Sequence, residues 1–214
     1  MSLGLVHALA MRRAPLAPLI QLLGQVHVLP APVTSPSADC VSNAEARLLA
    51  LLALRPGETD RRTVGGTLWP DVDDARAAGN LRSALWRLAA RPTPLVTVTR
   101  TSVALLPEVN VDVHLLGDWA ARMITGTSSP ADLAHVPWDI VGVEMLPGWH
   151  DDWIVLERER LRQRLLHGLE LMAAKLVEVD RCAEARRCYR EHRDLLAREL
   201  GVTPTPSLAA LIGV

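Results

Sequence analysis

The sequence has few aromatic residues, only one lysine and only three cysteines. Six tryptophans, one tyrosine and no phenylalanine leave leucine and valine to build the apolar cores. Lys175 is the only lysine, and we attribute the arginine-rich composition to a GC-rich genome. Hydrophobic residues make up 49% of the chain and charged residues 22%, which excludes a largely disordered protein.

The cysteines Cys40, Cys182 and Cys188 are odd in number and follow no motif, which excludes a disulfide framework and suits a reducing cytoplasm. No apolar run is long enough to span a bilayer. In residues 1–19 the arginines follow the apolar part, which is the reverse of a signal peptide. We therefore expect a cytoplasmic protein with no membrane partner, and a loose N-terminal extension over residues 1–19.

Motifs for metal binding or catalysis are also missing. There is no HExxH pair, no Cys/His zinc spacing, no GxSxG and no GxGxxG between a strand and a helix. Gly65 and Gly66 have no lysine near them that would make a phosphate loop. Asp151 and Asp152 follow His150 directly, and either aspartate is better placed to cap a helix than to bind a metal. We therefore expect that the protein is not an enzyme and binds no cofactor.

The net charge of −1 is unevenly distributed. Residues 1–108 hold 11 Arg or Lys and 8 Asp or Glu, a net of +3. Residues 109–214 hold 12 and 16, a net of −4. This difference favours a half that faces nucleic acid joined to a half that faces protein.

The N-terminal half reads as a strand, three helices and a hairpin. Residues 20–29 are rich in branched apolar residues and predict a strand, followed by a Pro/Ser loop and a short strand near Cys40 and Val41. Ser42 and Glu45 have the spacing of a capping box, which begins a leucine-rich helix that ends at Pro56-Gly57.

A second, short helix is predicted from after Asp60 to Trp69, although Gly65 and Gly66 weaken it. Asp73 or Asp74 caps a third helix, which ends before Pro92. Two strands around Thr101-Ser102 then form a hairpin, and residues 109–113 form a strand that leads into another helix. Three helices closed by a hairpin are the layout of a winged helix-turn-helix, in which the third helix enters the major groove of DNA.

The third helix contains the stretch NLRSALWRLAARP, residues 80–92. Leu81, Leu85 and Leu88 form its apolar stripe, and residues 75–92 contain no acid that phosphate would repel. We predict that the other side contacts DNA. Its candidate residues are Arg76, Asn80, Arg82, Ser83, Trp86 and Arg87. An ordinary surface helix in an arginine-rich protein is the alternative.

Three further arginines are candidates for phosphate contact. Arg61 and Arg62 precede the second helix, and Arg100 lies at the hairpin tip. Solvated loop charges are the alternative for all three.

The C-terminal half is predicted to be wholly helical. Helices are expected over residues 113–124, 130–141, 151–179, 182–200 and 207–212. The third of these is one helix or two, with Gly168 as the place for a break, and Gly201 ends the fourth. Antiparallel helix pairs of this kind resemble tetratricopeptide-type units, which bind proteins.

Two features of this half are expected to be structural and not functional. Trp138, Trp149 and Trp153 are expected to anchor packing, and a ligand site is the alternative. The alternating charges of residues 157–164 predict a solvated helix face, not a nucleic-acid patch.

Three segments together resemble a known family. They are GTLWPD with NLRSALWRL, LPGWHDDWIVLERERLR, and EARRCYREHRDLLARELGVTPTPSLAAL. They resemble the antibiotic-regulatory transcriptional activators of actinomycetes, the SARP family, over about residues 20–212. The resemblance implies an OmpR-type winged helix followed by a bacterial transcriptional activator domain. It further implies sequence-specific DNA binding, help to RNA polymerase, and side-by-side protomers on direct repeats.

The chain departs from the family in two places. The family often has a second arginine after the last leucine of the recognition helix, where this chain has Ala89, and Trp86 is unusual at its position. The motifs DRCAEA and EARRCY merge here into one, so about one repeat of roughly 34 residues is expected to be missing.

The sequence thus predicts an α+β winged helix-turn-helix over residues 20–107 and an all-α, TPR-like activator domain, shortened, over 109–214. The expected function is a DNA-binding transcriptional regulator, an activator of targets such as secondary-metabolite genes. Its expected partners are double-stranded DNA, RNA polymerase and a second copy of the chain on DNA. The alternative is a helical interaction module whose winged helix no longer binds DNA.

Overall fold

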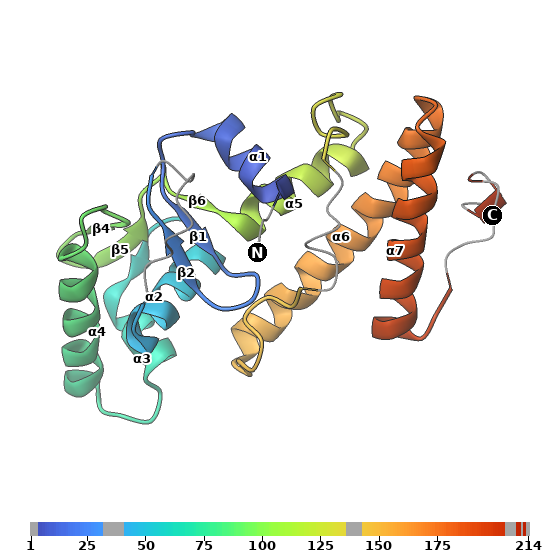
Figure 1. The fold of residues 1–214 in the computed structure, drawn as a ribbon. Helices are drawn as coiled ribbons and strands as arrows, with labels where there is room; N and C mark the ends of the chain where they lie inside the picture. Colours follow the sequence, from blue (N-terminus) through green and yellow to red (C-terminus); the bar gives the residue numbers. More distant parts are fainter. Residues whose placement is uncertain (1–3, 32–40, 136–142, 204–208, 211, 213–214) are drawn as a thin grey trace. The chain divides into compact units, whose positions relative to one another are not determined.

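The computed structural model describes residues 4–31, 41–135, 143–203, 209, 210 and 212. The chain forms two compact units. One is Ala10–Asp112, and the other joins Met1–Leu9 to Val113–Val214. We call them the mixed unit and the helical unit, since the strands belong to the first and the long helices to the second (Figure 1).

The first element corrects the predicted loose extension over residues 1–19. Helix α1 (Gly4–Arg13) occupies most of it. Leu5, Val6 and Leu9 on this helix are buried, so the segment is part of the folded structure. Its apolar residues recur at helical spacing and bury one face of the helix.

The predicted strand over residues 20–29 is wrong as a single element. It is a hairpin of β1 (Leu19–Gln21) and β2 (His27–Leu29), paired antiparallel. Gly24 has a φ of +79° between the two strands, a conformation that favours glycine and turns the chain. The predicted strand near Val41 is also wrong, because Val41 lies in no strand, while Cys40 and most of the Pro/Ser loop lie outside the described residues.

A distant strand completes this sheet. Strand β6 (Asn110–Val111) pairs parallel with β1, so the order is β2-β1-β6. The next residue, Asp112, is fully buried, and its carboxylate accepts hydrogen bonds from the backbone N–H groups of Leu22 and Leu23 at 2.9 to 3.0 Å. The carboxylate therefore supplies acceptors for the buried turn that joins β1 to β2.

Three helices follow in the mixed unit, as predicted. Helix α2 (Asn43–Leu54) begins with the predicted capping box of Ser42 and Glu45. Helix α3 (Arg61–Leu68) is capped by Asp60, and α4 (Asp74–Ala89) is capped by Asp73.

The two glycines of α3 differ in their surroundings. A Cβ on Gly65 would lie 3.6 Å from the Cβ of Ala77 on α4, which is an ordinary van der Waals contact. Gly66 has open space beside it. Packing therefore requires glycine at neither position, and both residues lower the helix propensity of α3.

The predicted hairpin is confirmed as β4 (Val96–Val98) and β5 (Ser102–Leu105). A third strand that the sequence did not predict, β3 (Thr59–Asp60), pairs with β5 on its other side. Two residues are too few to show a period, so this strand has no sequence signal. It ties the start of α3 to the hairpin.

The helical unit contains α5 (Asp112–Ile124), α6 (Asp152–Glu178) and α7 (Cys182–Leu200). Residues 130–135 form turns and bends, so the predicted helix over 130–141 is wrong there, and 136–141 lie outside the described residues. Of the last predicted helix, residues 209, 210 and 212 are helical, and 207, 208 and 211 lie outside the described residues.

Helix α6 runs unbroken through Gly168. A Cβ there would lie 3.1 Å from the Cβ of Ala120 and 3.3 Å from Cζ3 of Trp119. Glycine at this position therefore lets α5 cross α6 at close range. The residue that suggested a break is a contact point.

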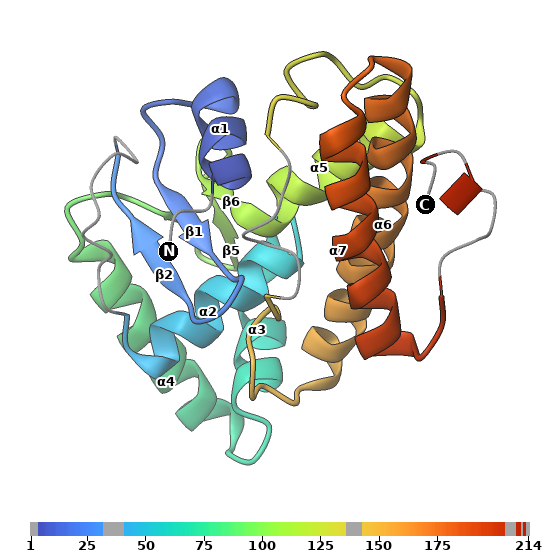
Figure 2. The same ribbon diagram turned by 45° about the vertical axis from the view of Figure 1, so that its right-hand side comes forward.

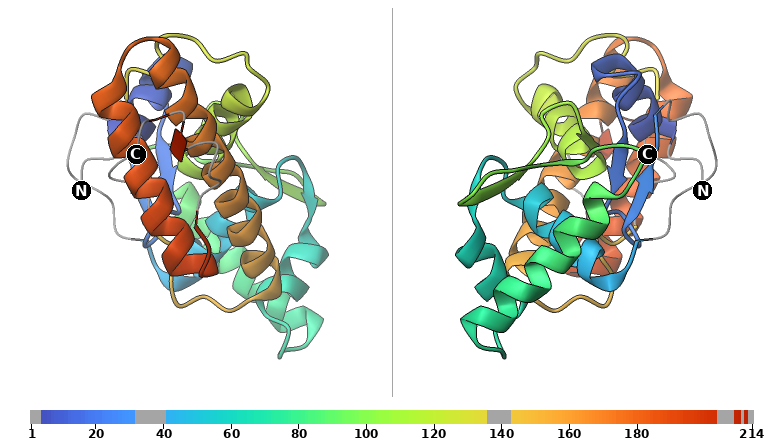
Figure 3. Two further views of the ribbon diagram at one scale, coloured as in Figure 1. Left: turned by 90° about the vertical axis from the view of Figure 1, so that its right-hand side faces the viewer. Right: turned by 90° about the vertical axis from the view of Figure 1, so that its left-hand side faces the viewer.

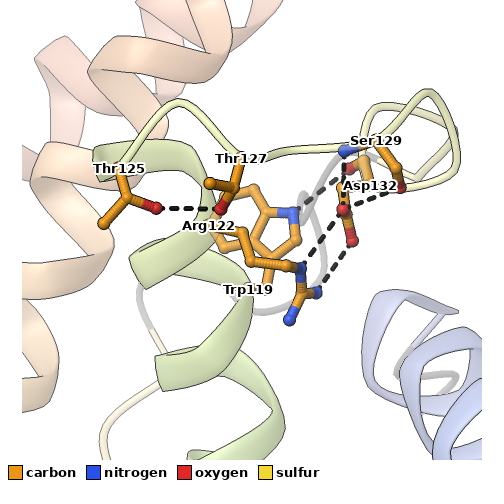
Figure 4. A network of polar contacts seen from close by, with 6 residues as sticks. All are labelled: Trp119, Arg122, Thr125, Thr127, Ser129 and Asp132. Carbon is orange, nitrogen blue, oxygen red and sulfur yellow. Dashed lines mark hydrogen bonds and ion pairs between the residues drawn. The ribbon is translucent and has the colours of Figure 1, made fainter.

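The segment after α5 is held by one buried carboxylate (Figure 4). Asp132 is fully buried, and it accepts hydrogen bonds from Arg122 at 2.8 and 3.2 Å and from the N–H and hydroxyl of Ser129. The indole N–H of Trp119 donates to the backbone carbonyl of Asp132 at 3.1 Å. These contacts replace the predicted helix with an ordered loop against α5.

Helices α6 and α7 lie side by side in opposite directions (Figures 2 and 3). Gly201 ends α7 in the left-handed conformation with a φ of +66°, as predicted. The buried residues of the pair include Leu169, Met172, Leu176, Ala185, Cys188 and Leu195. The two helices therefore share an apolar seam.

Candidate nucleic-acid interface

Helix α4 is built so that one side is apolar and the other is not. The Asp73 carboxylate accepts a hydrogen bond from the Arg76 N–H at 2.8 Å and so caps the helix. The predicted stripe is confirmed, and the buried residues of α4 are Ala77, Leu81, Ala84, Leu85 and Leu88. They pack the helix onto the mixed unit, which leaves the opposite side facing outward.

The outward side carries the predicted residues. Arg76, Arg82, Ser83, Trp86 and Arg87 are exposed, and Asn80 is half-buried. The indole of Trp86 is 73% exposed, which is unusual for the largest apolar side chain. The Ser83 hydroxyl donates to the Gly79 carbonyl at 3.1 Å, and its oxygen lone pairs are left to accept.

This side of α4 is an unneutralised positive surface. Among the residues that the structure describes, the guanidinium groups of Arg76, Arg82 and Arg87 have no ion-pair partner. Each keeps its donors for another molecule. Guanidinium groups match the geometry of phosphate oxygens and of the guanine edge.

An open hollow lies on the same side. It is lined by Gly79, Arg82, Ser83, Trp86 and Arg87. A Cβ on Gly79 would meet only Nη2 of Arg82, at 3.7 Å, so the helix backbone is bare at this point. The hollow is therefore lined by helix backbone, by an aromatic ring and by guanidinium groups.

A second group of candidate residues lies at the hairpin tip and the start of α3. The Arg61 N–H donates to the Thr101 carbonyl at 2.8 Å, and its guanidinium donates to the Thr99 carbonyl at 3.3 Å. Arg61 therefore connects α3 to the hairpin, and it is half-buried. Arg62 and Arg100 are exposed.

The hairpin turn is well ordered by side chains. The Thr99 hydroxyl oxygen accepts a hydrogen bond from the Ser102 N–H at 2.9 Å and lies 2.7 Å from the Ser102 hydroxyl. Ser102 in turn donates to Glu58 at 2.8 Å. Arg100 is thus presented on a turn with a defined backbone.

One contact just after the end of α4 was not predicted from the sequence. Nε of Arg91 lies 3.3 Å from Oε1 of Glu45, so the end of α4 is tied to the start of α2. Burial alone would raise the pKa of the Glu45 carboxyl, but hydrogen bonds from Ser42 and the charge of Arg91 outweigh it and lower this pKa. The two residues are 46 positions apart, and local patterns carry no signal for such a pair.

The remaining candidate residues of the sequence lie in the helical unit. Among the described residues, no group of three or more His, Cys, Asp and Glu side chains is placed to hold a metal ion. Trp149 and Trp153 are half-buried, while Trp138 lies outside the described residues. Burial raises the pKa of the Cys188 thiol to about 12, so this thiol stays protonated at neutral pH.

The charges of α6 behave as a solvated helix face. Arg162 pairs with Glu159 and Arg160 pairs with Glu157 along the helix surface.

Within the described part of the chain, no helix combines the length and the apolar character that crossing a membrane requires.

The comparisons with known proteins identify one region. Residues 155–213 match the family described as "Bacterial transcriptional activator domain". The match covers most of α6, all of α7 and the residues that follow. The search of curated proteins gives no match. The C-terminal region is therefore similar to a domain of bacterial transcriptional activators, while the predicted loss of one repeat is not tested and stays a prediction.

Proposed function

We propose that this protein is a sequence-specific DNA-binding transcriptional regulator without catalytic activity. In this proposal the mixed unit is an OmpR-type winged helix, α4 is its recognition helix, and β4 and β5 form its wing. The helical unit contacts RNA polymerase or a second copy of the chain, in the manner of the SARP family that the sequence resembles.

The outward side of α4 carries the proposal. It holds three guanidinium groups without ion-pair partners in the described structure, a hydroxyl and an exposed indole, and its helix contains no acid after Asp74. A surface selected only for solubility would mix charges of both signs. A surface for phosphate and base edges needs donors without nearby carboxylates.

The dimensions of α4 support the same proposal. Its 16 residues make a helix of about 24 Å, which is long enough to cross a major groove about 12 Å wide. Its leucines are used entirely for packing, so the outward side is free to approach the base pairs. The wing, with exposed Arg100 at its tip, is suited to the phosphate backbone.

The match at residues 155–213 supports the regulatory part of the proposal. Activation of secondary-metabolite genes, contact with RNA polymerase and assembly of protomers on DNA are proposed from the family resemblance. In the same way we propose that the protein acts in the cytoplasm, where bacterial promoters are found.

Fluorescence anisotropy of the full chain tests the proposal. The probes are the duplex upstream of its own gene and a scrambled duplex, each at several salt concentrations. Preferential binding that weakens steeply with salt is expected, because each phosphate contact contributes about −0.9 to the slope of log K against log salt.

A charge-matched control separates α4 from general attraction. Arg76, Arg82 and Arg87 changed together to alanine should abolish the preference for the upstream duplex. Arg13, Arg186 and Arg190 are also exposed, and their change to alanine removes the same charge elsewhere. Equal losses in the two triple variants would contradict a role for α4, and no binding at low salt would favour the helical interaction module instead.

A further inference from the structure

The outward side of α4 has a central line of small residues interrupted by one large one. With about 100° between successive residues, positions 75, 79, 83, 86 and 90 fall within an arc of about 80° opposite the buried stripe, and we call this arc the central line. Four of them are Ala75, Gly79, Ser83 and Ala90. The fifth is Trp86, whose indole is 73% exposed.

The guanidinium groups lie on both sides of this line. On the same helical wheel, Arg82 falls about 40° to one side of Trp86, and Arg76 and Arg87 fall about 80° and 100° to the other. A recognition helix in the major groove has one phosphate backbone on each side. The arginines are therefore placed toward the two strands, and the central line is placed toward the base edges.

The indole is the group that reaches deepest along that line. The neighbouring small residues let the helix backbone approach the bases, and Gly79 leaves the hollow beside the indole open. Side chains on a helix lean toward its N-terminus, so the indole leans toward Ser83 and Gly79.

The major groove offers one apolar feature to such a ring. All four bases present hydrogen-bonding groups there, and thymine also presents its apolar C5-methyl group. The minor groove, about 6 Å wide, admits a helix only when the DNA is strongly bent, whereas the major groove admits one without deformation, so we place the indole in the major groove.

We infer that Trp86 is a specificity-determining residue that recognises the C5-methyl group of a thymine in the operator. This inference rests on the proposed function. It adds that the ring makes an apolar contact with one base, while the flanking arginines hold the two backbones. The binding site therefore contains a required thymine at the position that faces Trp86.

The test uses duplexes that the full chain itself selects from a random-sequence pool. Each thymine of a selected duplex is replaced in turn by deoxyuridine, which lacks only the methyl group. Wild-type affinity should fall roughly fourfold at one thymine in each bound site, the loss expected for one buried methyl group. The other thymines should tolerate the replacement.

Variants of the indole link this loss to Trp86. In Trp86→Ala the deoxyuridine penalty at that thymine should disappear, and in Trp86→Phe it should remain in part. Leu16→Ala removes another highly exposed apolar side chain, 79% exposed, and should keep the full penalty. Unchanged melting temperatures would show that the variants fold.

The outcomes separate the inference from the proposed function. Selected duplexes without any methyl-sensitive thymine overturn the inference and leave DNA binding intact. A penalty that persists in Trp86→Ala overturns it as well, because another residue then contacts the methyl group. Failure to select or bind any duplex at low salt overturns both.

Discussion

Nε of Arg91 lies 3.3 Å from Oε1 of Glu45, and this pair joins the end of the proposed recognition helix to the beginning of α2. The same carboxylate accepts hydrogen bonds from the N–H and hydroxyl of Ser42, at 2.9 and 2.6 Å. One buried side chain therefore caps α2 and holds the C-terminal end of α4. This polar contact adds to the apolar packing that holds α4 in place.

Replacing that carboxylate should destabilise the mixed unit. We expect Glu45→Ala to lower the free energy of unfolding by about 1–3 kcal/mol, because the capping box is lost and Arg91 loses its buried partner. Urea unfolding followed by circular dichroism measures the loss, and faster hydrogen exchange in α2 locates it. Glu108→Ala, at an exposed position, should leave both unchanged; a similar loss in this control would contradict the assignment.

The same carboxylate should make stability depend on pH in the acid range. The pKa of Glu45 in the folded protein is below its ordinary value of 4.5, so the unfolded chain binds more protons between the two values. Its contribution is fully present above pH 4.5 and is lost as the pH falls through the folded pKa. The difference in unfolding free energy between wild type and Glu45→Gln should therefore shrink from pH 6 to pH 3. A constant difference would show that the charge of Glu45 does not contribute.

Loss of one guanidinium on α4 should reduce specificity. We expect Arg87→Ala to lower affinity for the selected duplex by about 1–3 kcal/mol and to lower affinity for a scrambled duplex less. Anisotropy titrations at one salt concentration give both values. Arg13→Ala removes an exposed arginine away from α4 and serves as the control. Equal losses on both duplexes would make Arg87 a phosphate contact.

Glycine-to-alanine changes should affect the free energy of unfolding in opposite directions in the two units. In Gly168→Ala the new Cβ would lie 3.2 Å from the backbone Cα of Ala120, so α5 and α6 must separate, and we expect a loss of about 1–3 kcal/mol. Gly66→Ala meets nothing within 4 Å and should gain up to about 1 kcal/mol from helix propensity. Differential scanning calorimetry of the full-length variants measures both. A stabilised Gly168→Ala would mean that the crossing of α5 and α6 can relax.

The sequence predicted well where local chemistry decides the structure. Ser42 with Glu45, Asp60, Asp73 and Gly201 each stand at the helix end that the sequence assigned to them. Caps act within one helical turn, so their residues are neighbours in the sequence. The exposure of Trp86 and Arg87 was predictable for the same reason, since the leucine stripe determines which side of α4 is buried.

The sequence predicted poorly where a distant partner decides. An apolar run such as residues 20–29 fits one strand or a hairpin, and pairing with β6 from the other end of the unit selects the hairpin. Residues 130–135 are apolar enough for a helix, but Asp132 is used by Arg122 and Ser129 in a loop instead. Strand β3 exists only because β5 supplies its hydrogen-bond partners.

The sequence by itself determined α2, α3 and α4, their caps, the hairpin of β4 and β5 and the acid-free side of α4, because each follows from residues within a few turns of one another. The tertiary structure alone decided that Glu45 meets Arg91, that Asp112 satisfies the turn after β1, and that Gly168 is a crossing point. These depend on burial, which removes water as a partner and forces each polar group or bare backbone to find one across the fold.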